Sequence, residues 1–397
     1  MANMEHALRT VTDRIAAARA DHTPLRLRGG GSKDFLGVSD GELLDTRPLS
    51  GVISYEPTEL VVTVGAGTPL AELEALLSEQ GQCLAFEPPH FSWSGAVVDG
   101  AQSVDGSPAT VGGMVAAGLA GPSRASVGGV RDYVLGVKLI NGLGQHLTFG
   151  GQVMKNVAGY DVSRLMVGAR GTLGLLTEIS LKVLPLPPAE ATLCFALEQH
   201  EALEHLHRWG GEPLPLNASR WSMVDSTPGV ASNHSLFVRL RGAVAAVEAA
   251  CQRMLAEVPG QRLEHAEAAP DWNLCRNQQL PFFSARPQPE HVLWRISVAQ
   301  TAPALRLPGH PLVEWHGGLR WLWAPLAAGA ELHALAREAG GSASLFVAAP
   351  GLDAARSSSL QTDSPTLNAI SQRLKASFDP QGIFNPGRTP DANQSRA

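Results

Sequence analysis

The sequence has no dense block of charge and no long apolar run, and each absence excludes a class of protein. Its 31 basic and 37 acidic side chains give a net charge of −6, and the basic ones form no long cluster. That distribution argues against a nucleic-acid-binding surface. No stretch approaches the roughly 18 apolar residues that a membrane-spanning helix needs. We therefore expect no DNA or RNA partner, and contact with a membrane only indirectly.

Cysteine is also scarce. The four cysteines, at positions 83, 194, 251 and 275, are too scattered for a disulfide framework, a zinc site or a set of iron–sulfur ligands. We expect no metal site, so electron chemistry in this chain cannot depend on clusters of its own.

The first 20 residues show a charged amphipathic helical pattern instead of the uninterrupted apolar segment of a secretion leader. We therefore expect a cytoplasmic protein. Docking on a membrane partner stays open.

Apolar residues, by contrast, are plentiful. They make up 44% of 397 residues, enough to fill the cores of two or three units. Strand-like and helix-like patterns are mixed along the chain, which predicts the α+β class. A proline cluster at 185–188 divides it. We predict a first domain over residues 1–187, a smaller α+β domain over 188–360 and a C-terminal helix and tail over 361–397.

Hydrophobic periodicity places most of the expected elements. A strand over 25–28 runs into a glycine loop, and a strand over 59–67 precedes a helix with Thr68 as N-cap and Pro69 at its first position. A hairpin is expected over 134–150. Further strands are expected over 191–197, 235–241 and 292–298, and helices over 203–209, 244–258 and 366–378. Residues 353–365 are the best candidate for a mobile linker, and the last ten residues are expected to fray.

Three glycine-rich segments stand out in the first 180 residues: "RGGGSKD" at 28–34, "SPATVGGMVAAGLAG" at 107–121 and "GARGTLG" at 168–174. Glycine permits positive φ and close approach of a ligand to the backbone. Each segment alone also fits an ordinary turn or close helix packing. Three of them, each near a strand and an apolar element, favour one large phosphate-bearing cofactor.

Two familiar nucleotide motifs fail. Ser32 precedes Lys33, the reverse of the order in a Walker loop, and Leu70 occupies the third glycine position of a dinucleotide fingerprint that begins at Gly65. An ATPase or an NAD-binding Rossmann domain therefore has little support.

The order of motifs resembles the flavoprotein family with the vanillyl-alcohol-oxidase (PCMH) type of FAD-binding domain. The strings "RGGGSKDF", "FEPPHF", "MKNVAGYDVSRL" and "FDPQGIFNPGR" resemble, more narrowly, the FAD-binding E subunits of bacterial glycolate oxidases. The resemblance covers nearly all of residues 25–187 and the C-terminal tail. It implies a PCMH-type FAD-binding domain of two α/β subdomains, a smaller α+β cap domain and a tail that returns to the FAD domain.

The resemblance also implies the cofactor-binding residues. The first loop would cradle the diphosphate of FAD, which would then be what crowds Gly29 to Gly31. The second would line the cofactor, and Thr177, Glu178 and Ile179 would lie near its adenine or ribose end. The implied residues are Arg28, Gly29, Gly30, Gly31, Ser32, Lys33 and Asp34; Pro108, Ala109, Thr110, Gly112, Gly113, Gly118 and Gly121; and Gly174, Thr177, Glu178 and Ile179. Lys155 and Tyr160 either line the flavin or belong to the core.

Two departures from the family pattern matter. Some relatives carry a His after the glycines that bonds covalently to flavin, but Ser32, Lys33 and Asp34 stand there, so we predict non-covalent FAD. Residues 92–105 look like an insertion, which leaves the contacts of Pro89 and His90 open.

Oxidation of a 2-hydroxy acid needs a cation for the carboxylate and a base for the hydroxyl proton. The catalytic candidates are Arg295 and Arg320, in strand-like apolar runs, and His316 beside a tryptophan. A structural ion pair would explain either arginine equally well, and packing would explain the histidine.

The resemblance implies a complex in which a sister FAD-binding subunit and an iron–sulfur subunit join this chain to oxidise glycolate, a small 2-hydroxy acid, to glyoxylate. Such a complex would hold the chain at the inner face of the membrane. Two other readings stay open: a stand-alone FAD dehydrogenase for D-lactate or a related acid, and a scaffold whose flavin has little catalytic part.

Overall fold

A computed structural model describes residues 2–37, 39–91, 108–151, 161–223, 234–349 and 364–388. Lys155, Tyr160, the predicted insertion at 92–105, most of the predicted linker at 353–365 and the end of the tail lie outside these residues. No helix in the described ranges has the length and apolar character needed to cross a membrane.

The N-terminal half is built on a five-stranded antiparallel sheet. Two helices cover one face, where apolar residues of α2 and α3 pack on β4, β6 and β8. The strands, in spatial order, are β3 (Val52–Glu56), β4 (Val61–Gly65), β8 (Leu175–Lys182), β6 (Val134–Ile140) and β7 (His146–Gly150). The helices of this half are α1 (Ala2–Asp21), α2 (Leu70–Glu79), α3 (Val111–Ala117), α4 (Arg124–Val127) and α5 (Val162–Leu165), with 3₁₀ turns η1 (Asp34–Leu36), η2 (Pro57–Glu59) and η3 (Val130–Asp132).

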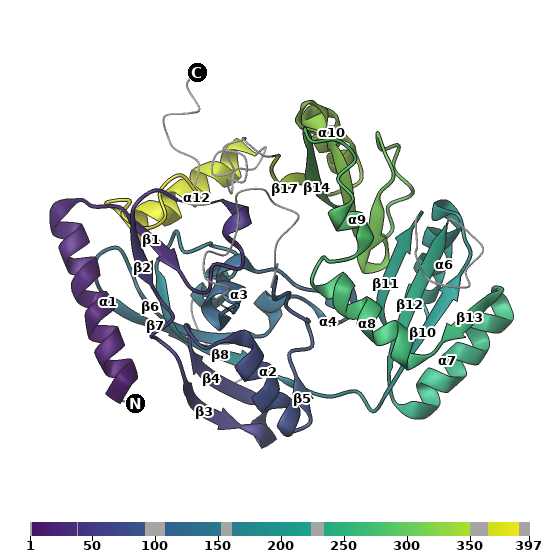
Figure 1. Cartoon of the computed structure of the whole chain (residues 1–397), viewed down its shortest axis with the longest axis horizontal. Helices are drawn as coiled ribbons and strands as arrows, with labels where there is room; N and C mark the ends of the chain where they lie inside the picture. The colour runs from purple at the N-terminus through teal and green to yellow at the C-terminus, as the bar shows by residue number, and fades with distance from the viewer. Residues whose placement is uncertain are drawn as a thin grey trace.

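Two small strand pairs flank this sheet: parallel β1 (Leu25–Arg28) with β2 (Glu42–Asp45), and β5 (Gln82–Cys83) with β9 (Leu184–Pro185). The apolar stripe of α1 packs against the first pair and against Ile383 and Phe384 of the C-terminal tail. Figure 1 shows α12 (Pro365–Phe378), in yellow, lying beside this N-terminal region. Residues 383 and 384 therefore pack in the same apolar cluster as the N-terminal helix.

The C-terminal half is an eight-stranded antiparallel sheet. Its strands, in spatial order, are β13 (Gly260–Leu263), β10 (Ala189–Phe195), β12 (Ser235–Gly242), β11 (Leu216–Ser222), β15 (Leu312–Glu314), β16 (Leu319–Pro325), β14 (His291–Ser297) and β17 (Ser342–Val347). Its helices are α6 (Gln199–Gly210), α7 (Val244–Glu257), α8 (His265–Arg276), α9 (Pro281–Ser284) and α10 (Gly329–Glu338), with 3₁₀ turns η4 (Trp315–Gly317) and η5 (Leu326–Ala328).

The two faces of this sheet have different neighbours. One face packs under α6, α7 and α10. The other packs on α8 and on Phe35, Leu36 and Phe91 of the N-terminal half. The molecule therefore has a buried seam between its two large sheets.

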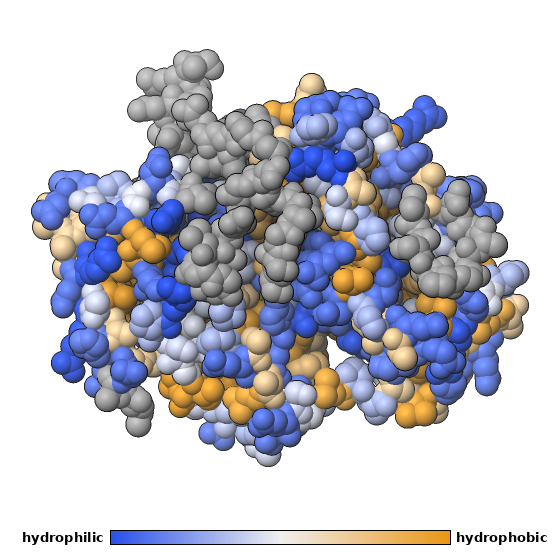
Figure 2. Space-filling model, viewed as in Figure 1, coloured by the Kyte–Doolittle hydropathy of each residue, from blue (hydrophilic) through white to orange (hydrophobic). Residues whose placement is uncertain are grey.

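Most predicted strands and helices are present, including the hairpin and the helix near the C-terminus. One boundary differs: α2 starts at Leu70, with Pro69 before it, and Thr68 caps no helix. The Thr68 hydroxyl instead accepts a 3.0 Å hydrogen bond from Gly51 N, so a tertiary contact replaces the expected local one. Figure 2 shows mixed polar and apolar surface, with apolar residues near the β3 edge, where Val52 and Ile53 are exposed.

Candidate functional site

The first glycine loop is stabilised by contacts among its own residues. Arg28 Nε lies 2.8 Å from Asp34 Oδ2, and Asp34 N donates to Gly31 O at 3.0 Å. Gly31 has φ +73°, a conformation that side chains rarely adopt, and a Cβ there would overlap the Arg28 guanidinium. The turn is therefore closed by an ion pair across its own ends.

The second segment touches the first. Thr110 caps α3, its hydroxyl accepting from Gly113 N at 3.1 Å, and a Cβ at Gly29 would overlap that hydroxyl. Gly112 N donates to Ala66 O at 2.7 Å, leaving no room for a side chain. Protein atoms therefore crowd Gly29 and Gly31, where we had expected the diphosphate of FAD to do so.

The third segment is hydrogen-bonded to the end of α3. Gly168 N donates to Val115 O at 3.0 Å, and Arg170 N donates to Ala116 O at 2.8 Å. Gly171 and Gly174 both have positive φ, and the Gly174 turn lies against Ile140 O. All three segments thus belong to one assembly around α3.

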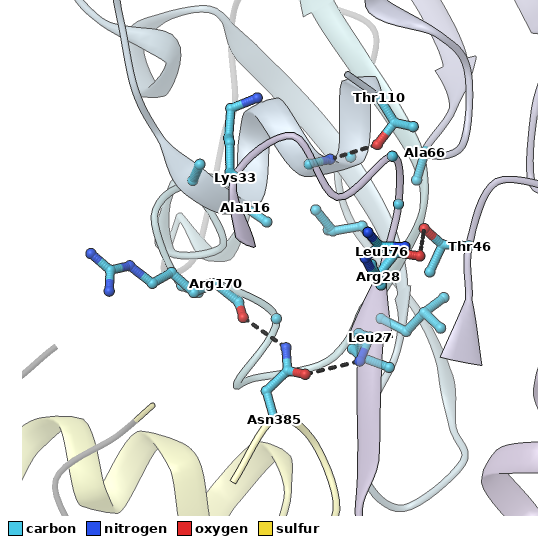
Figure 3. A pocket seen from close by; sticks show the side chains of 18 of the residues that line it. Leu27, Arg28, Lys33, Thr46, Ala66, Thr110, Ala116, Arg170, Leu176 and Asn385 are labelled. Atoms are coloured by element: carbon cyan, nitrogen blue, oxygen red, sulfur yellow. Dashed lines mark hydrogen bonds between the residues drawn. The ribbon is translucent and has the colours of Figure 1, made fainter. Parts of the chain in front are cut away.

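They enclose one cleft. The space among its walls, together with the solvent open to it, is about 940 Å³. Figure 3 shows its walls: the first loop, α3, the turn at Arg170 and, on the remaining side, Asn385 from the C-terminal tail.

The cleft is basic. Its described lining residues include four basic side chains, of Arg28, Lys33, Arg170 and Arg388, and one acidic side chain, Asp34. Burial lowers the pKa of Lys33 to about 8, and burial with the nearby Arg388 charge lowers the pKa of Arg170 to about 10. A dianionic group in the cleft would relieve both penalties.

The structure brings only part of the predicted set to this cleft. The predicted residues that line it are Arg28, Gly29, Gly30, Gly31, Ser32, Lys33, Asp34, Thr110, Gly112, Gly113 and Gly174. Outside its lining lie Pro108, Ala109, Gly118, Gly121, Thr177, Glu178 and Ile179. Ile179 is a core residue of the five-stranded sheet, and Glu178 pairs with Lys138 at 2.8 Å. The cleft stops at Leu176, one residue before Thr177.

Sequence reasoning assigned no role to several lining residues, among them Ala66, Ala116, Arg170, Asn385 and Arg388. The strings "GARG" and "FNPGR" contain the last three, and a glycine beside an arginine in each was the available signal.

A second group of interest lies in the interdomain seam, here meaning Phe35 and Phe91 of the N-terminal half with Trp315, Trp321 and Phe346 of the other. The Phe35 ring lies 5.1 Å from Phe91 and 5.5 Å from Phe346, and Phe346 lies 4.7 Å from Trp321. The aromatic rings therefore pack against one another across the seam.

One small pocket of about 340 Å³ remains in the seam, and Arg295 and Trp315 both line it. The guanidinium carbons of Arg295 and Arg124 lie 5.3 and 4.5 Å from the Trp315 ring centroid. The Arg295 guanidinium makes no hydrogen bond or ion pair with another described residue. Burial, with the Arg124 and Arg170 charges, lowers the pKa of Arg295 to about 10. Among the residues that the structure describes, this cation has no ion-pair partner.

Glu314 does not neutralise it. The Glu314 carboxylate already accepts from Trp321 Nε1 at 2.5 Å and from Cys275 Sγ at 2.9 Å. Burial raises the pKa of Glu314 despite these bonds and the nearby arginines. An anion entering the seam pocket would meet Arg295 beside a Glu314 carboxylate that Trp321 and Cys275 already engage.

Arg320 does not join Arg295. In the β14–β16 register Arg295 is opposite Trp321 and Arg320 is opposite Ile296, and directly opposed residues share a face while neighbours in sequence alternate. Arg320 is fully buried on the far face, where it donates to Ala302 O at 3.0 Å and Gly317 O at 3.4 Å.

His316 is buried between the two halves. Its ring nitrogens lie 3.1 Å from Ser219 Oγ and 3.0 Å from Ser126 Oγ, and burial lowers its pKa to about 4. Trp315 and His316 both have φ +55°, and Trp315 Nε1 donates to Gly121 O at 3.0 Å. Two consecutive left-handed non-glycine residues mark a backbone that its surroundings hold in place.

Ion pairs also join the two halves of the molecule. The Glu87 carboxylate, in the N-terminal half, lies 2.6 Å from Arg239 Nη2 and 2.6 Å from Arg241 Nη1. Both arginines are on β12. Burial opposes ionisation of Glu87, but the two arginines outweigh it and lower its pKa to about 2. In the described ranges, no three His, Cys, Asp or Glu side chains gather as a metal site would require.

Comparisons with known proteins agree with this geometry. The FAD binding domain family model matches residues 7–150. Glycolate oxidase subunit GlcE of Escherichia coli strain K12 is 43% identical over 378 residues, which are 95% of each chain. D-lactate dehydrogenase of Anaerostipes hadrus is 29% identical over 45% of this chain and 34% of its own length.

Among solved structures, p-cresol methylhydroxylase with substrate bound has a TM-score of 0.64 at 13% identity, covering 96% of this chain and 87% of that one. This likeness confirms the α+β class and the PCMH-type fold. With the near full-length identity to GlcE, it establishes that this chain belongs to the family of FAD-binding oxidoreductases that contains glycolate oxidase subunit GlcE.

Proposed function

We propose that this chain is the FAD-binding subunit of a complex that oxidises glycolate to glyoxylate. The observation that carries the proposal is the 43% identity to GlcE over 95% of both chains. The partners would be a sister FAD-binding subunit and an iron–sulfur subunit, and through them the protein would reach the inner face of the membrane.

Non-covalent FAD would occupy the cleft around α3. Bound FAD accepts a hydride or electrons. The chain's own part is to hold it: residues 28–34, Thr110, Gly112, Gly113 and Gly174 would contact it directly, and the other predicted residues would support those walls. The single cleft that these segments line together, with four basic side chains in its walls, supports this assignment.

Arg295 would bind the substrate carboxylate. Its guanidinium lacks a counter-ion among the described residues, and a planar fork pairs with a carboxylate at two points. The Arg295 guanidinium lines a narrow seam pocket beside Trp315. The surrounding aromatic rings would exclude water there.

We assign His316 and Arg320 differently. A pKa of about 4 keeps His316 neutral, and both ring nitrogens face serine hydroxyls, so His316 would fix the turn that carries Trp315. Arg320 would bind backbone carbonyls on the far face of the sheet.

The test is an anaerobic reduction, followed by the flavin absorbance. We expect yellow protein whose flavin is bleached by glycolate when the partner subunits are co-purified. Bleaching of the isolated chain by D-lactate or glycolate would instead support a stand-alone dehydrogenase, which the D-lactate dehydrogenase relative favours. Flavin that stays oxidised in the complex would support a scaffold.

The carboxylate assignment has its own test. Arg295→Gln should raise KM for glycolate about tenfold to a hundredfold, the cost of a lost charge-assisted pair, with flavin content unchanged. Arg337→Gln, on the exposed side of α10, is the control. An unchanged KM in Arg295→Gln would place the carboxylate elsewhere in the complex.

A further inference from the structure

Residues 383–388, here called the C-terminal clasp, form a wall of the cofactor cleft although the whole eight-stranded sheet separates them in sequence from its other walls. We propose that the clasp is part of the FAD site and that Arg388 opposes the negative charge of the diphosphate. The inference rests on the proposed function, because it requires bound FAD.

The clasp continues the edge of β1. Leu25 N donates to Ile383 O at 2.7 Å and Asn385 N donates to Leu25 O at 2.9 Å. One step further, Leu27 N donates to Asn385 Oδ1 at 2.9 Å. The strand that feeds the first glycine loop is thus fixed by the C-terminus of the chain.

The same asparagine reaches the third glycine segment. Asn385 Nδ2 donates to Arg170 O at 2.8 Å, and a Cβ at Gly171 would stand 2.6 Å from that nitrogen. Asn385 is 1% exposed and has φ +44°, a conformation that asparagine tolerates better than most residues. Figure 3 shows Asn385 bridging Leu27 and Arg170 beside the open cleft.

Helix α12 anchors the clasp. The buried Asp379 carboxylate accepts from Ile383 N at 3.1 Å and Phe384 N at 2.8 Å. Lys375 Nζ pairs with Asp379 at 2.6 Å and donates to Thr172 O and Phe384 O, both at 2.8 Å. The clasp is therefore held from behind while its other side meets the cleft.

The Arg388 guanidinium has a hydrogen-bond donor that makes no bond to a described residue. It donates from Nη1 to Arg170 O at 3.1 Å and from Nη2 to Gly37 O at 2.5 Å, while its buried Nε makes no hydrogen bond to a described residue. Asp34 is the acid whose charge acts on Arg388, and its carboxylate is already paired with Arg28. Because an unsatisfied buried donor is costly, an acceptor in the cleft would complete this site. The diphosphate is the anionic part of FAD.

The test compares Arg388→Gln with Arg373→Gln, an exposed arginine on α12. FAD is removed from each protein, its affinity is measured by titration with free FAD at several salt concentrations, and the apo-protein melting temperature is recorded. We expect Arg388→Gln to weaken FAD binding about tenfold or more and to flatten its salt dependence. Its apo melting temperature should match that of the control.

A chain ending at Pro380 is the second variant, and it should be purified without flavin. Wild-type affinity in Arg388→Gln, or full flavin content in the shortened chain, would overturn the inference. A loss of affinity explained entirely by a lower apo melting temperature would also overturn it, because the clasp would then be a structural brace only. Wild-type protein that never binds FAD would overturn the proposed function itself.

Discussion

The cofactor cleft and the interdomain seam are both enclosed by segments distant in sequence, but they are walled by opposite kinds of residue. Glycine and other small residues line much of the cleft, whereas tryptophan rings line the seam pocket beside Arg295. Small residues keep volume open for a large ligand, and large rings consume it. We therefore expect the cleft to take a large ligand and the seam to leave little room for one.

The largest expected effect is a loss of folding stability when an ion pair across the seam is removed. Glu87→Gln leaves Arg239, which is 2% exposed, and Arg241 without their shared carboxylate, and removal of one partner of a buried ion pair costs about 3–5 kcal/mol. Urea unfolding should show that loss in the free energy of unfolding. Glu248→Gln, in an exposed pair with Arg262, should leave the midpoint unchanged. A loss below about 1 kcal/mol in Glu87→Gln would mean that the pair does not hold the seam.

Gly112→Ala tests the cleft. The new Cβ would stand 2.7 Å from Ala66 O and 2.9 Å from Ala66 Cβ, and such overpacking costs about 1–3 kcal/mol. We expect FAD affinity to fall about tenfold to a hundredfold by equilibrium titration. Gly210→Ala is the matched control, since nothing lies within 4 Å of a Cβ at that position of α6. Equal affinities in the two variants would show that glycine is not what opens the cleft.

The smallest effect concerns pH. Lys33 has a pKa of about 8 in the cofactor-free protein, so below that pH it is charged before FAD binds and above it binding must take up a proton. The affinity for FAD should therefore fall as pH rises above about 8, by at most about tenfold per pH unit. In Lys33→Gln this dependence should be absent over the same range. Identical pH profiles would remove Lys33 from the anion site.

The sequence could predict those features of the fold and site that leave a short-range pattern in it. Strand alternation and helical periodicity located most elements, and the glycine segments indicated the cleft, because both are short-range patterns. Asn385 and Arg388 could not be assigned, since only the fold brings residues 383–388 beside β1. The separation of Arg295 from Arg320 depends on strand register, and a single apolar run does not reveal which face each residue takes.

The left-handed pair Trp315 and His316 was missed for a different reason. Local rules assign φ near +55° to glycine or asparagine, and here tertiary hydrogen bonds to Gly121, Ser126 and Ser219 hold a tryptophan and a histidine in it. Left-handed positions held by tertiary contacts cannot be recognised from local sequence alone.

Hydrogen–deuterium exchange of the chain with and without FAD tests the central claim most directly. The account predicts that one equivalent of FAD slows amide exchange together in four separate segments, at residues 28–34, 110–117, 170–176 and 383–388, while the far face of the eight-stranded sheet is unchanged. Slower exchange in only one of these segments, or mainly along the seam, would contradict a single cofactor cleft closed by all four.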